Sequence, residues 1–277
     1  MKTYYRSNVI RNKMQFKRDR FSRNKSTNSN NRLRFNETSI NLYGLNISLR
    51  KKFFFFNADF RLNKGITALT GESGQGKSLF SLFLFGLLPD YFTVSFDYII
   101  CIGLDGQANK FHFYKQYKRF IYNTDKITCS FMPQDALKLL NKRLSIFDNL
   151  YQQYNSYNKV SRTAFFHIMQ QQFSLLNLDF NMFYHLNVLL VSGGMLKRIC
   201  VIYCLLLKPN ILLIDEPTAG LDYMTQIKFM IFLKKVLKLY GCPKIIIITH
   251  NKYIVKHVQQ YYTLQNYVLK KTLVSHE

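Results

Sequence analysis

Long apolar runs, a signal-like segment and internal repeats are all missing from this chain of 277 residues. The longest apolar stretches, residues 79–88 and 199–207, stop well short of the roughly 18 residues that a helix needs to cross a bilayer. The first residues lack the apolar core of a secretory signal. No repeat indicates a second copy of the unit. We therefore expect no membrane span, no secretory leader and one unit, built as a large domain or two subdomains.

Cysteine is sparse, and its five copies lie apart within apolar runs: Cys101, Cys129, Cys200, Cys204 and Cys242. Cys200 and Cys204 would share one helix face, but no second pair stands near them to complete a metal site. We expect buried, reduced thiols. Apolar residues at 48% and aromatic residues at 16% supply enough core material to exclude a wholly disordered chain.

Acidic residues are the scarcest charged class, with 15 Asp+Glu against 39 Lys+Arg and a formal net charge of +24. Residues 1–36 hold eleven Lys or Arg and one acid, Asp19, so this stretch alone carries +10. Such a balance attracts nucleic acid, anionic lipid or acidic partners, although codon bias in an AT-rich genome produces the same composition. Residues 1–37 are predicted to form a disordered basic arm, with an organelle transit sequence as the alternative.

The remaining sequence alternates between strand-like and helix-like segments. Strands are predicted over residues 41–49, 52–62, 66–69, 94–102, 111–122, 211–214 and 245–248. Helices are predicted over residues 78–88, 195–207 and 225–239, and residues 136–178 form a helical region without Gly or Pro. Strands that alternate with helices indicate a parallel sheet covered on both faces.

A glycine-rich octamer lies between the strand at residues 66–69 and the helix that follows it. Its residues match the pattern G-x-x-x-x-G-K-[ST]: Gly71, Glu72, Ser73, Gly74, Gln75, Gly76, Lys77 and Ser78. The glycines let backbone N–H groups surround phosphates, and the helix N-terminus adds its positive dipole end. Lys77 is predicted to reach the β- and γ-phosphates, and the Ser78 hydroxyl to coordinate Mg²⁺.

Two acids end the apolar strand at residues 211–214. Asp215 at the strand tip is predicted to hold Mg²⁺, and Glu216 is predicted to act as the general base for an attacking water. Together the octamer and the acidic pair predict a nucleotide-hydrolysing site.

With these two motifs, four further segments resemble the ATP-binding subunit of an ABC transporter. Residues 191–195 (Val-Ser-Gly-Gly-Met) resemble the family's signature loop. The resemblance implies that Ser192, Gly193 and Gly194 bind the γ-phosphate of ATP held on an opposing subunit. It also implies a P-loop NTPase (RecA-like) α/β fold over residues 38–277, with an antiparallel β subdomain and an α-helical signature subdomain at about residues 136–195.

Four more residues receive a role through this resemblance. Gln134 resembles the Gln-loop residue that contacts Mg²⁺ and relays to the membrane subunit, and Asp222 the acid of the loop that crosses the dimer interface. His250 resembles the switch histidine that holds the γ-phosphate and the attacking water. Phe53 is chosen as the adenine-stacking aromatic from Tyr43 and the four phenylalanines at residues 53–56, although packing explains each of these rings as well.

The likeness is greatest to the peptide/nickel import group, and it covers residues 40–250. The chain departs from the family where Val191 replaces Leu and Met195 replaces Gln, and from the import group where Lys142 replaces Pro. The resemblance implies a cytoplasmic ATPase, peripheral on the inner face of the cell membrane, that uses ATP and Mg²⁺ to move a small solute.

The implied partners are transmembrane permease subunits and a second, identical or different, cassette. Anionic lipid is a candidate ligand of the basic arm, and nucleic acid is not expected. The alternative is a soluble ABC-type ATPase that acts on nucleic acid or in cofactor assembly.

Overall fold

The computed structural model describes residues 39–50, 52–62, 65–72, 74–84, 88–102, 108–112, 129–240 and 244–273. Three predicted features lie wholly or largely outside these ranges: the basic arm, Ser73 of the glycine-rich octamer, and most of the strand expected at residues 111–122. Within them, Cys200 and Cys204 are buried free thiols, as expected, whereas Cys129 is only partly buried.

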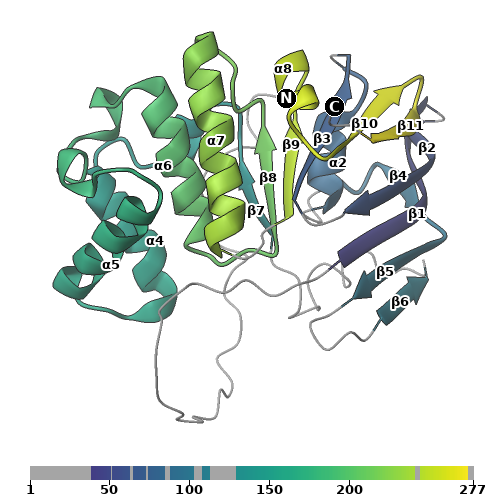
Figure 1. The fold of residues 1–277 in the computed structure, drawn as a ribbon. Coiled ribbons are helices and arrows are strands. Elements are labelled where there is room, and N and C mark those ends of the chain that lie inside the picture. Colours follow the sequence, from purple (N-terminus) through teal and green to yellow (C-terminus); the bar gives the residue numbers. More distant parts are fainter. Residues whose placement is uncertain are drawn as a thin grey trace.

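A parallel sheet forms the centre of the molecule (Figure 1). Its strands follow the order β11-β10-β3-β9-β8-β7, and only β11 runs antiparallel to its neighbour. In that order their bounds are Val268–Leu273, Gln260–Gln265, Ile66–Gly71, Lys244–Ile248, Ile211–Asp215 and Cys129–Met132. The predicted strands at 66–69, 211–214 and 245–248 are confirmed, whereas β7, β10 and β11 had not been predicted.

Both faces of the sheet are buried, because alternate residues of one strand enter two different cores. Leu212 and Ile214 of β8 pack in the core that includes helices α6 (Gly193–Leu205) and α7 (Tyr223–Tyr240). Ile211 and Leu213 pack in the second core, with helix α2 (Lys77–Leu84) and the antiparallel sheet. The expectation of a parallel sheet covered on both faces is confirmed.

The second sheet is antiparallel and has the order β2-β1-β5-β6, with β4 also paired to β1. The bounds of β1, β2, β4, β5 and β6 are Ser39–Leu49, Lys52–Leu62, Thr93–Ser95, Tyr98–Ile102 and Ala108–His112. The strand expected at residues 94–102 is therefore wrong as one piece. It divides opposite an irregularity at Gly44, where Asp97 N–H donates to the Tyr43 carbonyl at 2.9 Å.

Helices α4 (Ile146–Asn158) and α5 (Arg162–Leu175) lie beside α6, on the opposite side of the molecule from the antiparallel sheet (Figure 1). Ser145 and Ser161 cap these two helices by accepting from Asp148 N–H and Ala164 N–H. The 3₁₀ turns η1, η2 and η3 span Ala136–Leu139, Phe180–Met182 and Val188–Leu190, and helix α8 spans Lys252–Lys256.

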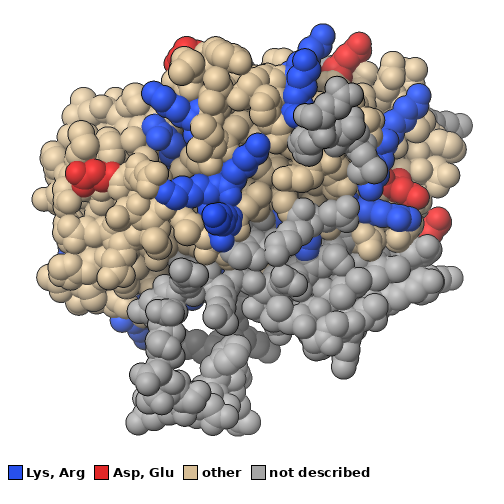
Figure 2. Space-filling model, in the orientation of Figure 1, with Lys and Arg blue, Asp and Glu red and all other residues tan. Residues whose placement is uncertain are grey.

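The helix predicted over residues 78–88 ends too late, since Leu88 lies outside it. Pro89 follows directly, and a proline disfavours helical geometry in the residue before it. No helix in the described ranges combines the length and apolar character that a bilayer crossing requires. Lys and Arg side chains are spread over the face seen in Figure 2, and the few acids lie apart from one another.

Candidate functional site

Most of the predicted site residues meet at one edge of the parallel sheet. Leu69 of β3 pairs with Ile248 of β9, Ile248 pairs with Asp215 of β8, and Ile214 pairs with Met132 of β7. Parallel neighbours in register end at the same edge, which is where ligands bind in open α/β sheets. The segments that leave this edge carry the glycine-rich loop, the acidic pair, His250 and Gln134.

The glycine-rich loop requires glycine for steric reasons at two positions. Gly71 has φ 145°, and a Cβ there would lie 2.6 Å from the Leu264 carbonyl oxygen. Gly76 has φ 107°, and its Cβ would lie 3.1 Å from Cβ of Phe54. An L side chain is disfavoured at both φ values. The loop therefore has close backbone packing behind it, and α2 begins directly after Gly76.

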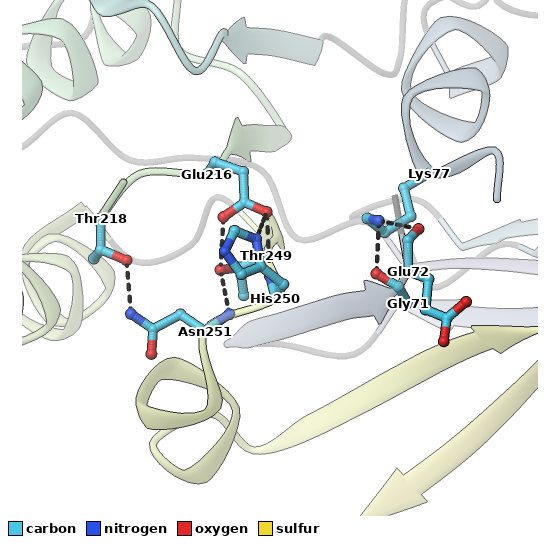
Figure 3. A network of polar contacts seen from close by, with 8 residues as sticks. All are labelled: Gly71, Glu72, Lys77, Glu216, Thr218, Thr249, His250 and Asn251. Atoms are coloured by element: carbon cyan, nitrogen blue, oxygen red, sulfur yellow. Dashed lines mark hydrogen bonds and ion pairs between the residues drawn. The ribbon is translucent and has the colours of Figure 1, made fainter. Parts of the chain in front are cut away.

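Lys77 folds back over this loop. Its ammonium donates to the Gly71 and Glu72 carbonyl oxygens, each at 2.7 Å (Figure 3). Partial burial lowers the Lys77 pKa, and the negative charges of Glu216 and Asp215 oppose this effect. The cation thus lies within the electrostatic reach of the acidic pair, as phosphate chemistry at this edge requires.

The surroundings of Asp215 make ionisation of its carboxyl less favourable than in water. Burial and the adjacent Glu216 raise its pKa to about 6, while Lys77 opposes the shift. A cation near this carboxylate would relieve the repulsion between the two acids. Among the described residues, no cluster of three or more His, Cys, Asp or Glu side chains forms a metal site.

Glu216 is fixed by both its backbone and its side chain. Its φ is 43°, and its N–H donates to the Ile248 carbonyl at 2.8 Å, which ties the end of β8 to β9. Its carboxylate accepts from the Thr249 hydroxyl at 3.0 Å and from His250 N–H at 3.1 Å (Figure 3).

The imidazole of His250 completes the contact, with Nδ1 at 2.6 Å from Glu216 Oε1. Because an ionised carboxylate only accepts, Nδ1 carries the hydrogen. The Glu216 side chain is 13% exposed and that of His250 is 78% exposed. The carboxylate is therefore oriented by its partners, whereas the imidazole ring faces solvent.

The loop at residues 191–195 begins helix α6. Ser192 is its N-cap and accepts from Met195 N–H at 3.4 Å. Gly194 is buried against α7, because a Cβ there would collide with Cγ2 of Thr225, whereas the nearest atom to a Cβ on Gly193 is Leu221 Cδ2 at 3.8 Å. Among the described residues, no hydrogen bond or ion pair joins this loop to the glycine-rich loop.

A shallow hollow runs between α6 and the sheet edge. Its lining includes Gln134, Gly193, Lys197, Asp215 and Ala219. Gln134 is exposed and follows β7 by two residues. The structure thus places Gln134 and Asp215 at one hollow, as the Mg²⁺ assignment had required.

The ABC transporter family model matches residues 55–219, which is more than half of the chain and includes the glycine-rich loop, the residue 191–195 loop and the acidic pair. The chain belongs to the ABC transporter family. It is an ATP-binding subunit of this family, and the predicted P-loop NTPase fold is confirmed.

Curated relatives of this ABC subunit include two nickel import system ATP-binding proteins NikD from Staphylococcus aureus. That of strain MRSA252 is 27% identical over 218 residues, which cover 77% of this chain and 79% of the relative. That of strain N315 is 25% identical over 229 residues, which cover 82% of this chain and 84% of the relative.

Two solved structures share the fold. The first is cbiO1 of Clostridium perfringens, part of the ABC transporter complex cbiONQ, with 20% identity, a TM-score of 0.64, and coverage of 84% of this chain and 88% of that one. The second is a bacterial Atm1-family ABC exporter with ATP bound, with 19% identity and a TM-score of 0.58. The match covers 85% of this chain and 39% of the exporter chain.

Asp222 of this ABC subunit has a structural role that its sequence assignment did not include. Its carboxylate accepts from Thr225 N–H at 2.9 Å and from the Thr225 hydroxyl at 2.5 Å, so that it caps α7. These hydrogen bonds lower the Asp222 pKa, although the group is fully exposed. The assignment of Asp222 to a dimer interface stays a prediction.

Three polar residues near the site were missed by sequence reasoning. Asn251 Nδ2 donates to the Thr218 hydroxyl at 3.1 Å and to the Gln226 side-chain oxygen at 2.8 Å. Figure 3 shows that this joins the segment after His250 to the segment after Glu216. Amides and hydroxyls of this kind have no sequence signal, because their partners lie 25 and 33 positions away.

The aromatic ring beside the glycine-rich loop is that of Phe54, which packs against Gly76. Phe53, the residue chosen from sequence, is 38% exposed and makes an edge contact with Phe56, their ring centroids 5.2 Å apart. Adenine stacking by Phe53 stays a prediction, and Phe54 becomes its nearest competitor.

Proposed function

We propose that this ABC subunit binds Mg-ATP and hydrolyses it, as one of a pair of cassettes, to drive import of a small solute through partner membrane subunits. The observation that carries this proposal is the orientation of Glu216. Thr249 and His250 hold its carboxylate at the same sheet edge as the Lys77 loop. A general base fixed beside a phosphate-binding loop is the arrangement that phosphoryl transfer to water requires.

The phosphate-binding part of the proposal assigns a role to each loop residue. The backbone amides of residues 71–76 surround the β- and γ-phosphates, and Lys77 moves from its two loop carbonyls to the phosphate oxygens. That exchange replaces two neutral acceptors by anionic ones, so it strengthens the hydrogen bonds of the ammonium.

The residues present fit Mg²⁺, which prefers hard oxygen ligands. The Ser78 hydroxyl, the Asp215 carboxylate and the Gln134 amide oxygen would hold it. The raised pKa of Asp215 supports this assignment, since a nearby cation favours the ionised carboxylate. When bound, Mg²⁺ neutralises phosphate charge and orients the terminal phosphate.

Glu216 then acts as the general base and His250 as the positioning group. Oε1 of Glu216 already contacts both N–H and Nδ1 of His250. Turning the exposed His250 ring toward the γ-phosphate would release Oε1 to accept the proton of the attacking water. Nucleotide binding and activation of the base are thereby linked through one side chain.

Among the described residues, no hydrogen bond or ion pair joins Ser192, Gly193 or Gly194 to the phosphate loop of their own chain. A second cassette would bring the residue 191–195 loop to the phosphates. Exposed large apolar side chains flank the residue 191–195 loop and the residue 218–222 loop in the sequence, and they favour a partner-binding face there. Four are more than half exposed: Leu189 at 58%, Leu190 at 73%, Tyr223 at 61% and Met224 at 59%. Such a concentration of exposed apolar area is typical of an interaction surface.

The similarity to NikD supports nickel as cargo and import as the direction, and a small peptide is the alternative cargo that the sequence motifs imply. This function puts the subunit on the inner face of the cell membrane, held by permease subunits. The basic arm of residues 1–37 would add contact with anionic lipid.

The test compares ATP turnover and assembly of the wild type with Glu216→Gln. The variant keeps the shape of the side chain but removes the base, so we expect loss of hydrolysis, retained ATP binding and a closed dimer in Mg-ATP. Sedimentation velocity with and without nucleotide measures the dimer. Asp179→Asn, at an exposed acid outside the site, is the matched control and should behave as the wild type.

Retained turnover in Glu216→Gln would refute the role of the base. A monomer in Mg-ATP, in both the wild type and the variant, would refute the paired cassette. ATPase stimulation by DNA or RNA, and not by co-expressed permease subunits, would favour a soluble ABC-type ATPase instead.

A further inference from the structure

Lys197 is a buried cation for which the proposed reaction has no use so far. It lies on α6, five residues after Ser192, and only 8% of it is exposed. Its ammonium donates to the Ala219 carbonyl oxygen at 2.6 Å. Among the described residues, no carboxylate lies within ion-pair distance of it. Burying an ammonium carries a desolvation cost that its contacts must offset, so this position requires a physical reason.

The acceptor of this hydrogen bond identifies what Lys197 controls. Ala219 N–H donates to the Glu216 carbonyl at 3.2 Å, so residues 216–219 form one tight turn that begins at the general base. Glu216 occupies the left-handed region in this turn, with φ 43°. That conformation is unfavourable for a glutamate and persists only where the surroundings hold it. Lys197 binds the last residue of the turn.

The same turn is also held by the His250 segment. Asn251 donates to the Thr218 hydroxyl, and Thr249 and His250 donate to Glu216 itself. Lys197 is thus the link from the signature helix, and Asn251 the link from the switch segment. The negative charge of Glu216 raises the Lys197 pKa, against the larger lowering by burial, which is consistent with a cation near the acid.

We propose that Lys197 is a positioning residue that couples the signature helix α6 to the turn carrying Glu216 within one subunit. Movement of α6 would be transmitted through the Ala219 carbonyl to the general base, and also toward Asp222 at the end of the same loop. This inference rests on the proposed function, because it assigns a purpose to the orientation of Glu216 during ATP hydrolysis.

The decisive variants are Lys197→Met, which keeps the length of the side chain but has no donor, and Lys197→Gln, which keeps a donor without the charge. Loss of a charge-assisted hydrogen bond predicts a fall in kcat of about tenfold to a hundredfold for Lys197→Met. The KM for ATP should change little, since Lys77 binds the phosphates. Lys197→Gln should recover most of the lost kcat. Lys228→Met, at an exposed lysine of α7, is the control.

Two further measurements separate positioning from a merely structural role. Lys197→Met removes the desolvation cost of a buried ammonium, which offsets the lost hydrogen bond, so Lys197→Met should melt no lower than the wild type. Amide hydrogen exchange should accelerate several-fold at Ala219 and Leu221, whose N–H groups donate within this loop. In the Glu216→Gln background, Lys197→Met should cause no further loss of turnover.

The proposal would be overturned if Lys197→Met had the kcat of the wild type and the wild-type rates of amide hydrogen exchange at Ala219 and Leu221. If Lys197→Met does not fold, Lys197→Gln decides it: its shorter, uncharged donor should still accelerate hydrogen exchange at Ala219 and Leu221, and wild-type exchange there would overturn the proposal. If the wild type itself hydrolyses no ATP, the proposed function fails, while hydrogen exchange in residues 216–222 still decides whether Lys197 holds this loop.

Discussion

Gly194→Ala provides the sharpest test of the packing between the signature loop and α7. A Cβ at this position would collide with Cγ2 of Thr225. Thr225 cannot simply rotate away, because its hydroxyl donates to Asp222 and its N–H is part of the same cap. Gly193→Ala is the matched control, since its nearest neighbour would lie at 3.8 Å, an ordinary van der Waals distance.

The magnitude follows from two opposing effects. Inserting a methyl group into a packed contact costs about 1–3 kcal/mol, whereas replacing a helical Gly by Ala contributes up to ~1 kcal/mol of stability. We therefore expect Gly194→Ala to lower the free energy of unfolding by about 1–2 kcal/mol, and Gly193→Ala to leave it unchanged or raise it. Thr225→Ser removes the colliding methyl group but keeps the hydroxyl, so it should restore most of the stability of Gly194→Ala.

Urea unfolding of the wild type, Gly194→Ala, Thr225→Ser and the double variant measures this double-mutant cycle, and Gly193→Ala is unfolded beside them as the control. The chain has no tryptophan, so far-ultraviolet circular dichroism is the suitable probe. Equal stability of Gly193→Ala and Gly194→Ala would refute the steric reasoning. So would a Thr225→Ser substitution that does not restore the stability of Gly194→Ala. Restored stability without restored ATP turnover would indicate a second requirement for glycine, consistent with phosphate binding by the residue 194 amide.

The remaining predictions concern the acidic pair, the aromatic ring and the arm. Since burial raises the Asp215 pKa from 3.8 to about 6, the folded state retains this proton to higher pH, and stability falls as pH rises through that interval. In EDTA, Asp215→Asn should therefore be more stable than the wild type above pH 6 and equal to it near pH 4. A difference in the free energy of unfolding that does not change with pH would show that it does not come from ionisation of Asp215. Phe54→Ala should weaken fluorescent ATP-analogue binding if the ring beside Gly76 stacks on adenine, whereas a larger loss in Phe53→Ala would restore the sequence-based choice. Deletion of residues 1–36 should leave ATPase activity intact and reduce sedimentation with anionic vesicles, and loss of nucleotide binding would show that the arm belongs to the fold.

The order of the motifs was readable from sequence because each motif is local. The phosphate loop, the acids after β8 and the loop before α6 each follow or precede a strongly apolar segment, and the structure has a strand or helix there. Errors occurred where a neighbouring strand decides the local conformation. The strand expected at residues 94–102 divides because both pieces pair with β1 on either side of Gly44.

The sequence by itself determined the candidate residues for the nucleotide chemistry, since Lys77, Asp215, Glu216 and His250 stand in motifs whose spacing is set by single strands and turns. Only the tertiary structure decided how these residues are held. Lys197 and Ala219 are separated by 22 positions and Asn251 and Thr218 by 33, so no local pattern joins them. Parallel strands in register bring their ends to one edge, and the hydrogen bonds between the loops that leave this edge orient the Glu216 carboxylate.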